Sequence, residues 1–168
     1  MLLFFVVFLF TLGLVPFVFL NFNTTEIKQV LPVYSVADTS WVASDGSEMV
    51  FKQDDFKWYQ HKDEYDDNYY SGTYEFYFGE KAVDYITTEL KQYGVTKSEL
   101  EDLFERNEEY SENNFVVFDL KYDAIVVGGE TSIPDQTLVP WYGFILEDGT
   151  YLDVANMNTG TYYKFSIR

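Results

Sequence analysis

Aromatic side chains give this chain its clearest capacity to bind another molecule. The 168 residues include 3 Trp, 15 Tyr and 16 Phe, which is an aromatic share of 20%. Rings that share one side of a sheet form a wall that suits a ligand pocket, and they equally suit a filled core in a small barrel. We predict as ligand-binding residues those rings that fall on predicted strands: Trp41, Trp58, Tyr74, Phe76, Trp141, Tyr142 and Phe144.

A second group of aromatics falls on the opposite side of the same strands. Tyr59, Tyr69 and Tyr77 belong to it, and exposed tyrosine is enriched where proteins meet. The net charge of -17 attracts cationic molecules and speeds their encounter. A cationic protein or peptide is therefore the second predicted partner, although the same charge also serves solubility.

An acidic segment offers the oxygen ligands that calcium prefers. We predict a weak metal site at Asp63, Glu64, Asp66 and Asp67. The segment lacks the spacing and the turn glycine of an EF-hand, so a solvated loop between strands is the alternative.

Other chemistry finds little support. His61 is the sole histidine and no cysteine is present, which excludes thiolate sites and sites built from several histidines. No nucleophile-elbow motif G-x-S-x-G accompanies His61. Gly128-Gly129 is followed by no helix with Lys and Ser or Thr, so it predicts a turn rather than a phosphate loop. We predict no catalytic residue, no cofactor and no enzymatic activity.

Charge and hydropathy limit the location and the partners. The negative charge repels phosphate backbones and anionic membrane surfaces, so nucleic acid is excluded as a partner. Leu2 to Leu20 carry no charge and would span about 28 Å as a helix, close to the thickness of a bilayer core. This pattern predicts a single-pass anchor in the cell membrane with an extracytoplasmic C-terminal domain. A cleaved signal peptide is the alternative, but no basic residue precedes the apolar run.

Hydrophobic periodicity beyond the anchor indicates mainly strands. Alternating patterns predict strands at residues 40–44, 47–53, 56–60 and 69–78, then at 115–121, 124–127, 141–147, 150–156 and through the final TYYKFSIR. The period changes to three and four at Glu80, which predicts a helix that Gly94 ends. Thr96 and Glu99 have the spacing of a capping box and predict a second helix.

These elements predict a mainly β, α+β fold. Hairpin-length turns favour antiparallel neighbours, and eight or nine short strands protect their edges by closing into a small meander barrel. An open sheet covered by the helix pair is the alternative. The predicted organisation is a transmembrane anchor at 1–22, a linker at 23–38, and a barrel domain at 39–168 with a helical insertion at 80–110.

Several short motifs resemble those of bacterial lipocalin-like envelope domains. These motifs are Thr39-Ser40-Trp41, the Asp45-Gly46 turn, Met49-Val50-Phe51, and Tyr70-Ser71-Gly72-Thr73-Tyr74. Thr39 stands where the classical signature has Gly, and the helices interrupt the strands instead of following them. The resemblance implies a calyx that holds a small apolar ligand, or a surface that docks a partner, without a cofactor. The alternative function is that of a structural or interaction protein of the envelope with a filled barrel.

Overall fold

The structure is a computed structural model that describes residues 35–61, 67–134 and 138–168. The anchor predicted at 1–22 and most of the predicted linker lie outside these ranges. Within the described ranges, no helix has both the length and the apolar character needed to cross a bilayer.

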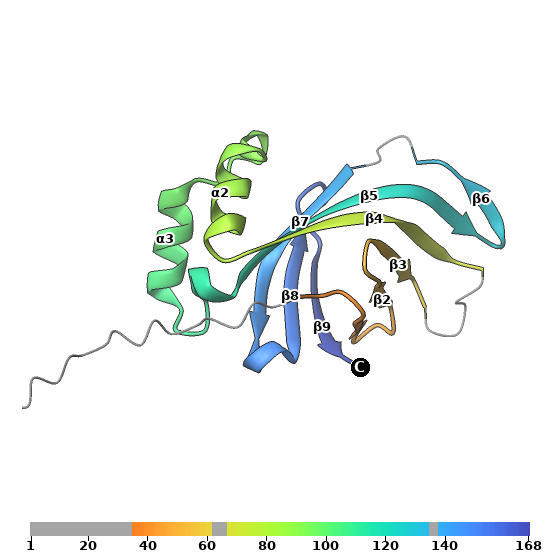
Figure 1. The fold of residues 1–168 in the computed structure, drawn as a ribbon, viewed down its shortest axis with the longest axis horizontal. Helices are drawn as coiled ribbons and strands as arrows, with labels where there is room; N and C mark the ends of the chain where they lie inside the picture. Colours follow the sequence, from red (N-terminus) through yellow and green to blue (C-terminus); the bar gives the residue numbers. More distant parts are fainter. Residues whose placement is uncertain (1–34, 62–66, 135–137) are drawn as a thin grey trace, which may run out of the picture. The chain divides into compact units, whose positions relative to one another are not determined.

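The described residues form an antiparallel barrel (Figure 1). Its strands are β1 Ser40–Ala43, β2 Glu48–Phe51, β3 Asp55–Tyr59, β4 Tyr69–Phe78, β5 Phe115–Val127, β6 Glu130–Ser132, β7 Leu138–Leu146, β8 Tyr151–Asn156 and β9 Tyr162–Ile167. The sheet order is β4-β3-β2-β1-β9-β8-β7-β5-β6, and β4 also pairs with β5. This extra pairing closes eight strands into a meander barrel and leaves β6 as a short addition to β5. The predicted barrel is confirmed, and the open-sheet alternative is wrong.

Two strand predictions differ from the structure around β5. Residues 115–121 and 124–127 belong to one continuous strand rather than two. Its register with β4 shifts between Ser71 and Gly72, which pair with Ala124 and Tyr122 and leave Asp123 without an opposite residue. Such a bulge bends a strand without ending it. The structure also adds β6, a three-residue strand that the sequence pattern did not predict.

The barrel interior is filled by large side chains. Inward residues of β5 alternate from Val116 to Tyr122, and they meet buried rings from the other strands, among them Phe51, Phe56 and Trp141. Phe51 stacks on Phe118 with ring centroids 5.5 Å apart. Val36 also lies in this core at 1% exposure, so packing begins a few residues before the predicted domain boundary.

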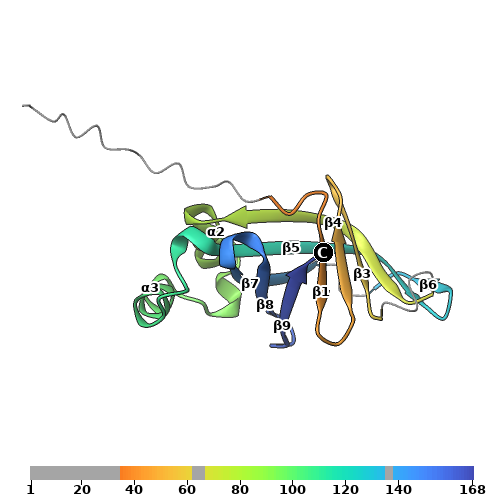
Figure 2. The ribbon, with the colours of Figure 1, turned by 90° about the horizontal axis from the view of Figure 1, so that it is seen from below.

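Helices fill the connection between β4 and β5 (Figure 2). They are α2 Glu80–Thr88 and α3 Lys97–Arg106, with the 3₁₀ turns η1 Lys91–Tyr93 and η2 Glu112–Asn114; a third such turn, η3 Glu147–Gly149, joins β7 to β8. Gly94 caps η1 in the left-handed region at a φ of 80°. The predicted capping box of α3 is present, with Thr96 and Glu99 bonded reciprocally.

The helices cover the outer surface of β5 and β7. Their apolar faces contribute Ala82, Ile86 and Leu100 to a second buried cluster. The outward residues Phe115, Val117 and Phe144 complete it from the barrel side. Residues on both faces of β5 are therefore buried, inward against the barrel core and outward against the helices.

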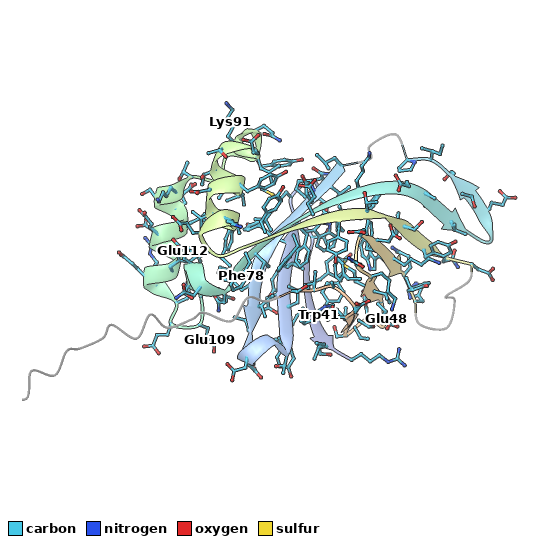
Figure 3. All side chains as sticks on the ribbon, viewed as in Figure 1. Trp41, Glu48, Phe78, Lys91, Glu109 and Glu112 are labelled. Atoms are coloured by element: carbon cyan, nitrogen blue, oxygen red, sulfur yellow. The ribbon has the colours of Figure 1, made fainter. Side chains whose placement is uncertain are left out.

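The strand registers define two ends of the barrel. One end, here called the mouth, carries the loops β1–β2, β3–β4 and β8–β9 together with the hairpin that leads into β6. The other end, here called the base, carries the helical connection and the turns β2–β3 and β7–β8. Trp41 and Glu48 lie on the β1–β2 hairpin, apart from Lys91, Glu109 and Glu112 of the helical connection (Figure 3).

Gly143 lies where the backbones of β7 and β8 approach each other closely. A Cβ at this position would lie 1.8 Å from the carbonyl oxygen of Asp153 on the neighbouring strand. Because that atom belongs to backbone, Gly143→Ala should cost about 3 kcal/mol or more of stability, measured by denaturant unfolding.

Gly94→Ala is the matched control, because nothing lies within 4 Å of its Cβ position and only its positive φ is strained. That change should cost about 1 kcal/mol. An equal cost for the two variants would contradict the close strand approach.

Candidate ligand-binding cup

A cup of about 410 Å³ opens at the mouth of the barrel. Described residues from β3, β4, β5, β7, β8, β9 and the loops at the mouth line it: Trp58, Gln60, Tyr70, Tyr122, Ile125, Pro134, Val139, Asn156, Asn158, Thr159, Thr161 and Tyr163. Its volume lies within the range of about 300–1,000 Å³ that is usual for small-molecule sites.

The wall and floor of the cup are an aromatic cluster. The ring of Trp58 lies 5.4 Å from that of Tyr70 and 5.6 Å from that of Tyr163, measured between centroids. Tyr122 lies 5.4 Å from Tyr70, and Trp141 supports Trp58 from below in an edge-on contact at 5.3 Å. These rings hold one another in place, so the apolar surface exists before any ligand arrives.

Three polar atoms of this aromatic cluster are buried and do not reach the surface of the cup. The indole nitrogens of Trp58 and Trp141 and the Tyr122 hydroxyl are fully buried and lack a hydrogen-bond partner among the described residues. Burial, followed by the proximity of Tyr70, raises the pKa of Tyr122, and the nearby Trp141 N–H opposes the rise. The surface that Trp58 and Tyr122 present to the cup is therefore carbon.

A turn between β8 and β9 forms the polar side of the cup. The Asn156 side-chain oxygen accepts hydrogen bonds from the backbone N–H groups of Asn158 at 2.9 Å and Thr159 at 3.1 Å. Because backbone N–H groups only donate, these bonds fix which end of the amide is oxygen. The NH₂ group faces the other way, and Asn156 is only 8% exposed.

The helical connection holds this turn from outside. Tyr93 of η1 donates its hydroxyl hydrogen to Asn158 Oδ1 at 2.6 Å. The backbone N–H of Met157 donates to the carbonyl of Pro140 at 2.9 Å, which fixes the turn to β7. The polar side of the cup is thus tied to two neighbouring elements.

The predicted ligand-binding residues are divided among three places. Trp58 lines the cup, and Trp141 lies directly behind it at 1% exposure. Trp41, Tyr74 and Phe76 lie in or against the barrel core away from the cup.

Two of the predicted residues lie on the outer surface of the barrel. Tyr142 and Phe144 have the opposite parity to Trp141 on β7, and they pack against the helical connection. Phe144 stacks on Tyr110 with centroids 4.1 Å apart. The structure therefore does not bring these two rings together with Trp58.

Sequence reasoning missed several cup residues. Tyr122 fell between two predicted strands, and Tyr163 lay on the last predicted strand, but nothing in the sequence indicated that these residues meet at the mouth. Asn156 closes a strand and opens a turn with Gly160, a pattern typical of a side-chain-capped turn. Its part in the cup depends on the register of β7, β8 and β9.

Most of the predicted metal site, namely Asp63, Glu64 and Asp66, lies outside the described residues. Asp67 is exposed, and its carbonyl accepts a hydrogen bond from Gly129 N–H at 3.1 Å. No group of three acidic or histidine side chains suited to a metal ion occurs within the described ranges. His61 is exposed and borders a smaller hollow of about 260 Å³ beside the cup.

A buried carboxylate lies on the outer face of β5 beneath α2. Asp119 accepts a hydrogen bond from the Tyr85 hydroxyl and stands directly across from Glu75 on β4. Burial, and to a smaller extent Glu75, raise the pKa of Asp119, whereas the Tyr85 bond lowers it. Tyr77 stacks on Tyr85 at 3.8 Å, and burial together with its bond to Glu75 raises the pKa of Tyr77 to about 12.

Comparison with known proteins gives this site no relative. No protein-family model, no curated protein and no solved structure matches the chain.

Asp119 predicts a specific dependence of stability on pH. Its raised pKa means that the folded protein holds this proton more tightly than the unfolded chain, so stability falls as pH rises through that range. Asp119→Asn should stabilise the fold at pH 7 by roughly 0.5–1 kcal/mol, the scale of a like-charge pair across strands.

The advantage of Asp119→Asn should shrink as the pH is lowered below about 4, where the carboxyl is protonated in both states. Thermal unfolding across this pH range measures it. Asp123→Asn, at an exposed position on the same strand, is the control and should change little. A loss of stability at pH 7 in the Asp119 variant would contradict this account.

Proposed function

We propose that the barrel domain binds a small, mainly apolar molecule in the cup and performs no chemical step on it. The observation that carries this proposal is the hollow of about 410 Å³ at the end of an otherwise packed barrel. Its aromatic surface is held by ring contacts and its polar side by backbone bonds. A preformed site of this kind needs little reorganisation to bind a ligand.

The lipocalin-like motifs support the same function. A closed antiparallel meander of eight strands is the architecture of lipocalins, whose interiors hold one small ligand. Trp41 follows Thr39 at the base and donates its indole N–H to the Thr39 hydroxyl at 2.7 Å. We propose a lipocalin-like domain in which bulky rings restrict the ligand space to the mouth.

We further propose that this domain is carried outside the cell membrane by a single anchor. The support is the uncharged run from Leu2 to Leu20, which lies outside the described residues. A membrane-held domain would meet its ligand in the envelope or at the lipid surface.

A cationic partner is the second candidate. The support is the net charge of -17 together with the exposed acidic side chains of α3, among them Glu101, Asp102 and Glu105. Binding of a basic peptide through this helix should weaken as the salt concentration rises. It should also weaken when Glu101 and Glu105 are replaced by Gln and Asp102 by Asn in one variant. Binding that ignores salt would count against it.

The filled-barrel alternative has support from the packed interior below the cup. Under that alternative the chain is an interaction protein of the envelope, and the hollow at the mouth holds no ligand. The two hypotheses predict different effects of a small apolar probe on the NMR signals of the tryptophans.

Fluorine NMR of the full chain labelled with fluorotryptophan tests the cup. Indole, a small neutral probe, should shift the Trp58 signal saturably and leave the Trp41 signal unchanged, because only Trp58 lines the cup. Thr161→Phe places a ring at the exposed rim and should weaken indole binding about tenfold or more.

Thr88→Phe makes the same change on the exposed side of α2 and should leave the indole titration intact. If indole shifts no signal, or shifts all three tryptophans without saturation, the filled-barrel alternative is favoured instead.

A further inference from the structure

The described lining of the cup consists entirely of uncharged side chains. It combines aromatic and aliphatic residues with Gln60, Asn156, Asn158, Thr159 and Thr161. The chain as a whole carries 28 acidic and 11 basic residues. Among the described residues, the charged side chains therefore lie outside the lining of the cup.

An uncharged lining penalises ions of either sign. A charged ligand that enters a partly closed site loses water, and this loss is large unless an opposite charge or several hydrogen bonds replace the water. The described part of the cup supplies no opposite charge. The net charge of -17 adds repulsion against anions in particular.

The side-chain amide of Asn156 offers the cup a hydrogen-bond donor. The oxygen of Asn156 is occupied by two backbone N–H groups, and the structure gives its NH₂ group no acceptor among the described residues. Asn156 is nine-tenths buried and belongs to the lining of the cup. Its nitrogen is not one of the fully buried polar atoms without a partner, so it remains accessible to solvent. A ligand that displaces water from this NH₂ group must supply an acceptor in its place, so this position selects for one on the ligand.

The remaining surface of the cup selects for a ring. Trp58, Tyr70 and Tyr163 line the cup, and the centroid of the Trp58 ring lies 5.4 Å from that of Tyr70 and 5.6 Å from that of Tyr163. The indole nitrogen of Trp58 is fully buried, so the surface that Trp58 presents to the cup is carbon. The apolar face of a ligand ring can stack on such a surface while its edge reaches the turn that holds Asn156.

We propose that the cup takes an uncharged ring with apolar faces and a hydrogen-bond acceptor at its edge, which Asn156 recognises. This inference rests on the proposed function and narrows its ligand class. The same chemistry occurs in a neutral amide-bearing sugar ring and in an aromatic amide, and the experiment contains one arm for each.

Titrations of the full chain, read from the Trp58 fluorine signal, use probes that differ in charge but hardly in shape. Benzamide, benzoate and benzamidine form the aromatic arm, and N-acetylglucosamine and glucosamine form the sugar arm. In at least one arm the neutral member should bind on the order of tenfold more tightly than its charged counterparts. The arm that responds identifies the source of the ring.

Asn156→Asp is the decisive variant. The carboxylate keeps the oxygen that accepts from Asn158 and Thr159, so the turn is retained, while the donor becomes an anion. Affinity for the neutral amide should fall about tenfold or more, and affinity for the cationic member of the same arm should rise. Indole carries a donor and no amide acceptor, so its binding should persist and report an intact cup.

Ser98→Asp adds the same charge at an exposed position of α3 and should leave every affinity unchanged. Equal binding of charged and neutral probes to the wild-type chain, or an Asn156 variant that leaves all affinities unchanged, would overturn the inference. Indole binding without any binding of benzamide or N-acetylglucosamine would overturn it too, while leaving the proposed function intact. Failure of indole itself would remove the proposed function.

Discussion

Closure of the sheet through β4 and β5 is the constraint on which the rest of this structure depends. Ten residues of β4, from Tyr69 to Phe78, pair with β5 in one long ladder, and this ladder joins the two halves of the meander. A closed barrel of eight strands leaves an interior about wide enough for its own side chains. Because the inward positions carry Phe, Tyr and Trp, the described side chains pack against one another at the base and in the middle of the barrel. The cup opens at the mouth, where the strands end and short polar residues of the β8–β9 turn replace inward rings.

The helical connection follows from the same ladder. β4 and β5 are neighbours whose connection leaves from the base, so a segment of thirty-odd residues between them must fold back onto the barrel wall. The outward residues Phe115, Val117 and Phe144 give that wall an apolar surface, and α2 and α3 cover it. Covering this surface has an effect at a distance, because Tyr93 reaches from η1 to Asn158 at the mouth. An element that enters the fold at the base thereby steadies the rim of the cup.

Local signals predicted most elements and could not predict the cup. Period-two alternation gave β4 its observed bounds, and the Thr96 capping box gave α3 its start, because both depend on neighbours in the sequence. The sequence pattern predicted two strands where the structure has β5 alone. The alternation breaks at the bulge residue Asp123, and the strand continues past it because both sides pair with β4. Parity along β7 assigned Trp141 inward, yet Tyr142 and Phe144 were also expected in the pocket. Both faces of β7 are buried, so the apolar character of a residue does not indicate whether its side chain points into the barrel or toward the helices.

Charge placement and packing together explain how a strongly acidic chain can offer a neutral site. Carboxylates lose much hydration energy when buried, so most of the described ones lie on exposed loops and helix faces. The buried ones include Glu48, which bonds to Arg168 and Ser40, and Asp119, which accepts a hydrogen bond from Tyr85. The mouth is built from strand ends that continue the apolar alternation of the core, and its turn uses an amide rather than a carboxylate to hold backbone N–H groups. A carboxylate at position 156 could accept the same two backbone hydrogen bonds, at a greater cost of desolvation. Asn in this place keeps a donor where Asp would add another negative charge, and this donor is the group that we propose recognises the ligand.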